Sequence, residues 1–341
     1  MDDLSRILIL NQNWLGDVLF STPAIRALRR RFPQAYLACL APRRVSEALA
    51  HNPHLNEVLV YDERWNLRTL FEPLRVWRQL RRRRFDAVFL FHRSRSKALL
   101  AALAGIRTRI GLARGGRDWL LTHAVEPPQG PVHKIDVLLH LVSAAGVPSA
   151  GRWPEVEPTA EEEASLAKLL HGEGIASKDA FAVLHAGGNW ELKRWPVDYF
   201  IRWIRLFRKK NDWKIVLCGT AGEAPLSQKI LDAFPDGQVV SVCGRTTLGE
   251  LASLMKRARL VLSNDSGPIH VAASQRARVL GLYGPTSPRE TGPVSEGPVR
   301  VLWKDVGCQV PCYFRACNHR ACMDLLTPEE VFERTEELLA L

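Results

Sequence analysis

Asp17 is the first candidate side chain for acid–base chemistry. It ends the segment 11–17 (NQNWLGD), which follows the apolar run 6–10 directly. Gly16 permits a tight turn there. A carboxylate at the end of a buried strand can act as a general base and accept a proton from a substrate hydroxyl. Aspartate is equally favoured as a helix N-cap, and the local sequence leaves both roles open. The loop lacks the dinucleotide-binding pattern Gly-x-Gly-x-x-Gly.

A second segment, 185–196 (HAGGNWELKRWP), combines paired glycines with a lysine. Gly187 and Gly188 would let the backbone approach a phosphate closely, and Lys193 would supply a mobile positive charge. The spacing is not that of a Walker phosphate-binding loop. The alternative is a surface turn in which Lys193 is simply solvated.

The third segment, 263–274 (SNDSGPIHVAAS), has the composition of a strand end followed by a helix start. Pro268 suits the first helical position. A helix beginning at Asp265, Ser266 and Gly267 would offer N–H groups and a partial positive charge to an anion, with His270 about one turn further on. Capping by Asp265 or Ser266, with a structural His270, is the alternative.

Apolar runs that alternate with amphipathic stretches would position these three segments. This alternation is typical of parallel α/β domains. A second series of such elements begins near residue 150, which predicts two doubly wound domains, 1–150 and 151–341, facing each other across a cleft. The expected strands are 6–10, 36–40, 57–61, 87–91, 180–184, 214–218, 239–242, 260–263 and 279–283. The expected helices include 71–84, 161–170, 197–208, 224–234, 248–257 and 328–339.

The net charge of +11 is confined to the first of these domains. Residues 1–150 contain 23 Lys and Arg against 12 Asp and Glu, whereas residues 151–341 contain 24 of each. A one-sided basic field suggests an anionic partner, such as nucleic acid, an acidic membrane surface or a phosphorylated glycolipid. A solvated basic surface is the alternative. Neither a spanning apolar stretch nor a signal peptide is visible, so we expect a cytoplasmic protein.

Four of the seven cysteines lie close together, at Cys308, Cys312, Cys317 and Cys322. Zinc favours four sulfur ligands, but this spacing is not that of the paired ligand hooks of structural zinc sites. We expect reduced structural thiols, with a zinc site and a disulfide as alternatives. No Asp-x-Asp and no Gly-x-Ser-x-Gly occur, which disfavours a metal-held nucleotide sugar and a serine nucleophile.

Taken together, these segments resemble glycosyltransferase family 9, the ADP-heptose:lipopolysaccharide heptosyltransferases. The likeness spans nearly the whole chain and is greatest to the second heptosyltransferase of that pathway. The matching segments are WLGD at 14–17 with Pro23, AGIRTRIG at 104–111, KRWP at 193–196, NDSGPIH at 264–270, GLYGPT at 281–286, and the cysteine-rich tail through LTP at 326–328.

The resemblance implies a GT-B fold in which the first domain binds the acceptor and the second binds the nucleotide sugar. It implies an inverting transfer of heptose from ADP-heptose to the lipopolysaccharide inner core, with no cofactor and no required metal. Asp17 then corresponds to the catalytic base and Lys193 to a donor-phosphate contact. The remaining donor-binding positions are Asp265, Ser266, Gly267, His270 and, near the family's ribose-binding acid, Glu223. Where some members carry hydroxyl side chains, this chain has Gly187 and Gly188, so those contacts would come from backbone N–H groups.

The basic first domain fits an anionic acceptor of sugar acids and phosphates on a lipid. Arg93, Arg95 and Lys97 are the expected acceptor contacts, while the run 81–84 (RRRR) would face solvent or membrane headgroups. The expected partners are ADP-heptose, the glycolipid and the cytoplasmic face of the inner membrane, with no nucleic acid. The alternatives are a family member with another acceptor, such as a protein or a different glycan, and a sugar-nucleotide epimerase of the same fold.

Overall fold

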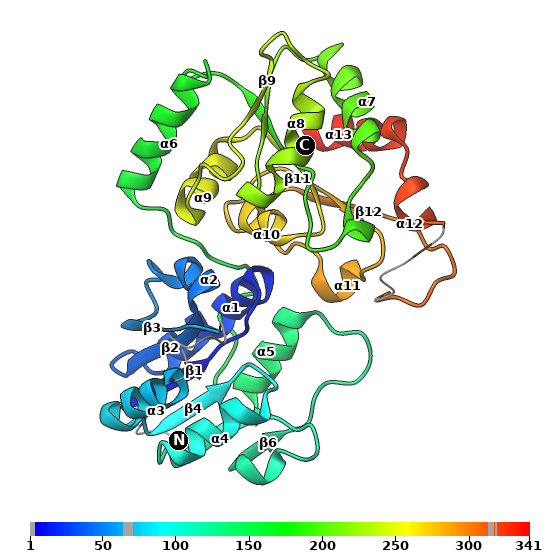
Figure 1. Ribbon diagram of the computed structural model, residues 1–341. Helices are drawn as coiled ribbons and strands as arrows, with labels where there is room; N and C mark the ends of the chain where they lie inside the picture. The colour runs from blue at the N-terminus through cyan, green and yellow to red at the C-terminus, as the bar shows by residue number, and fades with distance from the viewer. Residues whose placement is uncertain (1–3, 64–70, 313–316, 318) are drawn as a thin grey trace. The chain divides into compact units, whose positions relative to one another are not determined.

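The computed structural model describes residues 4–63, 71–312, 317 and 319–341. The chain divides into two compact units, Met1–Glu155 and Val156–Leu341 (Figure 1). The predicted boundary at residue 150 lies just before this division. Each unit is built on its own six-stranded sheet.

The sheet of the first unit has the strand order β3-β2-β1-β4-β5-β6, and every neighbouring pair is parallel. The chain adds β2 and β3 on one side of β1 and then continues with β4 on the other side. The loops that leave β1 and β4 therefore diverge at a topological switch point, where open α/β sheets bind ligands. The strands are β1 (Arg6–Leu10), β2 (Tyr36–Pro42), β3 (Glu57–Tyr61), β4 (Ala87–Leu90), β5 (Thr108–Leu112) and β6 (His123–Val125).

Helices cover both faces of this sheet. On one face α3 (Glu72–Arg83) and α4 (Arg95–Leu103) bury Val76, Leu80 and Ala98 against strand residues such as Leu8. Side chains alternate along a strand, so Ile7 and Ile9 point to the other face, where α1 (Leu15–Arg31) packs along α5 (Lys134–Ser143). The short helix α2 (Arg43–Ser46) follows β2.

The second unit repeats this topology with the order β12-β11-β10-β7-β8-β9, again entirely parallel. Its switch point lies between β7 and β10, so the loops after these two strands lie side by side. The strands are β7 (Phe181–His185), β8 (Lys214–Leu217), β9 (Val239–Ser241), β10 (Leu260–Asn264), β11 (Val279–Tyr283) and β12 (Val299–Trp303).

The core of the second unit contains several aromatic side chains. Trp203 and Phe207 of α7 (Val197–Arg208) stack with ring centroids 4.9 Å apart, and Trp203 donates to the hydroxyl of Thr335 on α13 (Pro328–Leu339). This face also carries α8 (Ala224–Leu231), and the short α11 (Pro288–Thr291) and α12 (Ala321–Asp324) follow β11 and precede α13. Elsewhere α6 (Ala160–Gly172) and α10 (Gly267–Ser274) pack along α9 (Leu248–Arg257).

The predicted α/β class with two doubly wound domains is confirmed, and the predicted strands and helices end within a few residues of the observed ones. The sequence analysis did not predict α4, α5, the short helices α2, α11 and α12, or the strands β5, β6 and β12. Both β6 and β12 are sheet-edge strands whose side chains are exposed or only partly buried, so they lack the continuous apolar run that marks a buried strand. Among the described residues, no helix combines the length and apolarity that crossing a bilayer requires.

Candidate functional site

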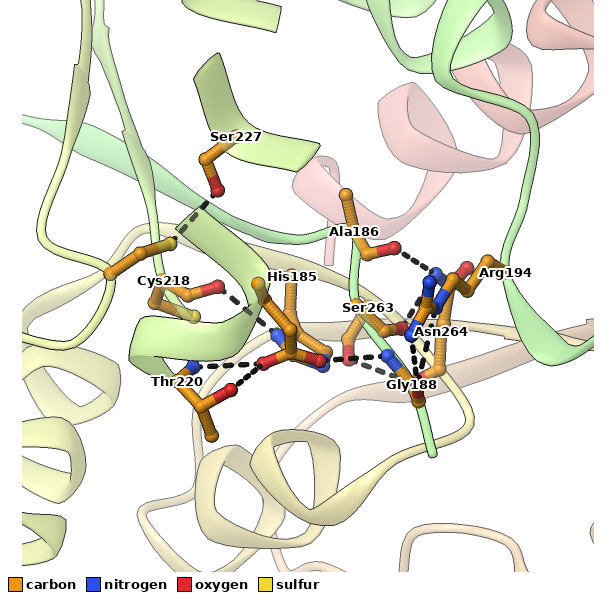
Figure 2. A network of polar contacts seen from close by, with 12 residues as sticks. His185, Ala186, Gly188, Arg194, Cys218, Thr220, Ser227, Ser263 and Asn264 are labelled. Carbon is orange, nitrogen blue, oxygen red and sulfur yellow. Dashed lines mark hydrogen bonds and ion pairs between the residues drawn. The ribbon is translucent and has the colours of Figure 1, made fainter. Parts of the chain in front are cut away.

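The carboxylate of Glu223 links two loops by hydrogen bonds. One is the glycine turn after β7, formed by Gly187 and Gly188, and the other is the loop after β8. The Gly188 N–H donates to Oε1 over 2.9 Å, while the N–H and hydroxyl of Thr220 donate to Oε2 over 2.8 and 2.9 Å (Figure 2). A Cβ on Gly187 would overlap this carboxylate, so a side chain there would displace Glu223 from its position. Glu223 therefore shapes the glycine turn, and the Gly188 N–H predicted to bind phosphate already has a partner.

Glu223 stays ionised although it is largely buried. Burial raises the pKa of its carboxyl, but His185 and the donors of Thr220 and Gly188 together bring that pKa below its ordinary value. The His185 ring is buried and its Nδ1 bonds the Cys218 carbonyl over 3.1 Å. Burial lowers the pKa of His185, so the imidazole is neutral at neutral pH. We therefore attribute the stabilisation of the carboxylate chiefly to its hydrogen-bond donors.

Asn264 joins the two loops at the switch point, and sequence analysis did not assign it a role. Its amide Nδ2 donates to the carbonyls of Ala186 and Gly187 over 2.9 and 3.0 Å (Figure 2). Its Oδ1 accepts the Trp195 N–H over 3.1 Å. The side chain is fully buried at the end of β10. It thus fixes both ends of the loop that carries Lys193. Its position directly before Asp265 was the available signal, but its partners are backbone groups that a sequence does not reveal.

Lys193 and Asp265, predicted separately from two segments, meet in the structure. Lys193 Nζ lies 2.7 Å from Asp265 Oδ2, and both side chains are largely buried. The Thr286 hydroxyl, after β11, donates to the same Asp265 oxygen. Lys193 also lies over the Trp190 ring, 5.1 Å from its centroid. The pair places one positive and one negative charge at the carboxyl edge of the sheet.

Helix α10 begins beside this pair, as predicted. Ser266 is its N-cap residue in extended conformation, and its side chain makes no capping hydrogen bond. Asp265 instead bonds Lys193 and Thr286. The interpretation of Asp265 or Ser266 as a side-chain cap of this helix is therefore wrong. Gly267 opens the helix and His270 lies buried on its first turn. The positive end of the helix is thereby directed to the edge that carries Lys193.

Asp17 lies in the first turn of α1, at the switch point of the first unit. The N-cap of this helix is Trp14, so the N-cap interpretation of Asp17 is wrong. Its carboxylate forms an ion pair with Lys134, at the start of α5, over 2.7 Å between Oδ1 and Nζ. His92, just after β4, is close enough for the Asp17 charge to affect its titration. Burial nevertheless lowers the pKa of His92 to about 4, with Lys97 and Arg117 acting in the same direction.

The three predicted acceptor contacts separate into two kinds. Arg93 and Arg95 are exposed around the start of α4. Lys97 instead turns inward, where its Nζ donates to the Asn11 carbonyl and to Asn13 Oδ1, each over 2.8 Å. Burial lowers the pKa of Lys97 to about 8. As the third residue of α4 it faces the loop after β1, so in this structure it supports the loop that leads to Asp17.

The cysteine tail lies against the loop that carries Lys193. Cys308, Cys312, Cys317 and Cys322 are free thiols that line one small cavity together with Leu192 and Arg320. The Arg320 guanidinium donates to the Arg194 carbonyl over 2.7 Å. Backbone N–H groups of His319 and Arg320 lower the pKa of Cys317. Within the described part of the chain, no three His, Cys, Asp or Glu side chains are arranged to hold a metal ion. The metal content of the tail stays a prediction.

This chain is similar in sequence and in fold to known glycosyltransferases. Residues 73–319 match the profile of glycosyltransferase family 9 (heptosyltransferase). Lipopolysaccharide heptosyltransferase 2 of Salmonella typhimurium is 26% identical over 98% of this chain and 99% of its own. The structure of Escherichia coli ADP-heptose lipopolysaccharide heptosyltransferase II superposes with a TM-score of 0.79 at 24% identity, covering 98% of both chains. A family 9 glycosyltransferase of Veillonella parvula gives 0.88 at 22% identity, covering 100% of this chain and 99% of that one. With two doubly wound sheets and a family match over most of its length, the chain belongs to glycosyltransferase family 9, the heptosyltransferases.

Proposed function

We propose that this protein transfers L-glycero-D-manno-heptose from ADP-heptose to the inner core of lipopolysaccharide, with inversion at the anomeric carbon. One observation carries the proposal. Lys193, Asp265 and the start of α10 converge at the switch point of the second sheet, in a chain that belongs to a heptosyltransferase family. A cation beside a helix N-terminus is suited to the diphosphate of a sugar nucleotide.

The second unit is the proposed donor-binding unit. Lys193 would exchange part of its pairing with Asp265 for the donor diphosphate, and the positive end of α10 would face the same group. As the bond between the anomeric carbon and the diphosphate breaks, its electron pair leaves with ADP. Fixed positive charges stabilise the negative charge that develops there. Glu223 acts here through Gly188 and Thr220, so we assign it the positioning of the glycine turn.

The first unit is the proposed acceptor-binding unit, with Asp17 as the base. The carboxylate would take the proton of the acceptor hydroxyl as its oxygen bonds to the anomeric carbon from the face opposite ADP. The ion pair with Lys134 and the helix start orient this carboxylate. Arg93 and Arg95 remain available for the anionic acceptor, whereas Lys97 supports the loop from within.

The proposal requires no metal and no cofactor, because the positive charges assigned to the donor diphosphate come from the chain itself. It places the protein in the cytoplasm, peripheral to the inner membrane that contains the glycolipid. Its basic character fits this location, since the first 150 residues supply the whole surplus of eleven positive charges. Nucleic acid is not among the proposed partners.

A transfer assay tests the proposal. The protein is incubated with ADP-heptose, with EDTA, and with truncated lipopolysaccharides that carry zero, one or two heptoses. We expect ADP release that depends on one of these acceptors, and a product heavier by one heptose. ADP-heptose consumption without an acceptor would favour an epimerase or a hydrolase. Transfer only to a protein or to another glycan would favour the family member with a different acceptor, and loss of transfer in EDTA would refute the metal-free mechanism.

A further inference from the structure

We propose that the surface formed by α3 and α4 docks the first unit onto an anionic phospholipid bilayer. This α3–α4 surface consists of Leu74, Arg78, Arg81 and Arg82 on α3 with Leu99 and Leu103 on α4. The inference rests on the proposed function, which gives the protein a membrane-embedded acceptor, and it identifies the face that meets that membrane.

The helical spacing gathers these residues on one side. Leu74, Arg78, Arg81 and Arg82 follow the i, i+4, i+7, i+8 stripe of a single helix face, opposite the buried Val76. On α4, Leu99 and Leu103 stand one turn apart, opposite the buried Ala98 and Ala101 that contact the sheet. Both stripes therefore point away from the sheet.

The two helices form one continuous surface. The Trp77 indole N–H on α3 donates to the Leu103 carbonyl at the end of α4 over 3.0 Å, and the Arg81 guanidinium lies over the Trp77 ring. Figure 1 shows the helices beside each other in the first unit. Arginine and leucine side chains are thus interspersed on this surface.

Exposure and charge indicate which partner fits. Leu99 and Leu103 are 43% and 58% exposed, and Leu74 is 40% exposed. Arg75 and Arg83 are neutralised by Glu72 and Glu57, but no carboxylate of the described residues pairs with Arg78, Arg81 or Arg82. Exposed leucines flanked by unpaired arginines match the boundary of an anionic bilayer, where apolar side chains enter the acyl region and guanidinium groups remain with the phosphates. A nucleic acid would leave the leucines unburied.

Vesicle sedimentation with the full chain tests this surface without donor or acceptor. We expect binding to phosphatidylcholine vesicles that contain phosphatidylglycerol, and binding at least about tenfold weaker to phosphatidylcholine alone. The double change R78E and R81E should weaken binding to the vesicles that contain phosphatidylglycerol by at least about tenfold. The double change L99S and L103S should do the same. The matched controls lie on exposed positions of the second unit. R205E with K209E makes the same charge change, and L325S with L341S the same apolar change, so both should bind as the unchanged protein does.

Thermal unfolding of each variant confirms that these exposed substitutions leave the fold intact. Equal binding to both kinds of vesicle would overturn the proposal, as would surface variants that bind like the unchanged protein or controls that lose binding equally. Tight binding of duplex DNA that the arginine substitutions weaken and the leucine substitutions leave unchanged would replace the bilayer by nucleic acid. Transfer to a deacylated, soluble acceptor is measured in parallel. Its failure would refute the proposed function, whereas unchanged transfer with lost vesicle binding is the result that the docking surface predicts.

Discussion

Replacing Glu223 by glutamine would test whether the glycine turn must be held in place for the donor to bind. The carboxylate accepts three hydrogen bonds, one from Gly188 and two from Thr220. Glutamine has the same shape, but its amide nitrogen cannot accept a hydrogen bond. It would therefore face the donors of either Gly188 or Thr220 without bonding them. The perturbation therefore removes acceptors while it leaves the volume unchanged.

The structure sets the size of the effect. Loss of a helix-capping interaction costs about 1 kcal/mol, and a hydrogen bond to a charged group contributes about 1.5–3 kcal/mol. The Glu223 side chain is 16% exposed, so water replaces part of the loss. We expect the free energy of unfolding of the second unit to fall by about 2 kcal/mol. Gly188 lies in the same loop as Lys193, the proposed contact of the donor diphosphate. The dissociation constant of ADP should therefore rise by about tenfold.

Glu250 provides the matched control. It forms the same capping box as Glu223, with Thr247 in place of Thr220, and it is equally part of the second unit. Its carboxylate accepts the Thr247 N–H over 2.7 Å, and among the described residues no hydrogen bond joins it to the glycine turn. E250Q should therefore lower stability by about 1 kcal/mol and leave ADP affinity within about twofold of the unchanged protein.

Calorimetric titration with ADP and denaturant unfolding measure the two quantities. Unchanged ADP affinity in E223Q, or equal losses in E223Q and E250Q, would refute the positioning role of Glu223. The pH dependence gives a second check. The folded-state pKa of Glu223 lies below its ordinary 4.5, so its contribution to stability is present above that pH and disappears as the pH falls through the folded-state pKa. The stability difference between E223Q and the unchanged protein should shrink accordingly in acid.

Four further predictions concern the two sites and the cysteine tail. D17N should lower turnover by at least about 100-fold with ADP affinity unchanged, and activity within a few-fold of normal would exclude Asp17 as the base. K193A should weaken ADP binding and slow transfer together, and calorimetry that shows normal ADP affinity would remove Lys193 from the donor site. Reversing Arg93 and Arg95 should raise the KM of the acceptor alone; an effect confined to the donor KM would reverse the assignment of the two units. Elemental analysis of protein purified without chelator should find well under one zinc per chain, and stoichiometric zinc would make the cysteine tail a metal site.

The charge of the chain and the order of its motifs could be interpreted without coordinates. Apolar runs such as those of β1, β7 and β10 predict buried parallel strands, because a strand covered on both faces needs apolar side chains throughout. In a doubly wound sheet the loops after such strands meet at one edge, so Asp17, Lys193 and Asp265 could be placed near sheet edges from the sequence alone. Short edge strands such as β6 and β12 escaped because only part of their surface is buried.

The partners of the polar groups depended on the tertiary structure. Asn264 bonds carbonyls 78 and 77 positions away in sequence, and Lys97 bonds groups 86 and 84 positions away. These contacts depend on strand register and on the direction in which a side chain leaves its helix, and neither is encoded in the type of one residue. Sequence analysis could therefore state that Lys97 is basic and near an edge, but not that it faces inward. Burial decides this, since a lysine enclosed beside Asn11 and Asn13 finds its hydrogen-bond acceptors within the protein and has little contact with solvent or a ligand.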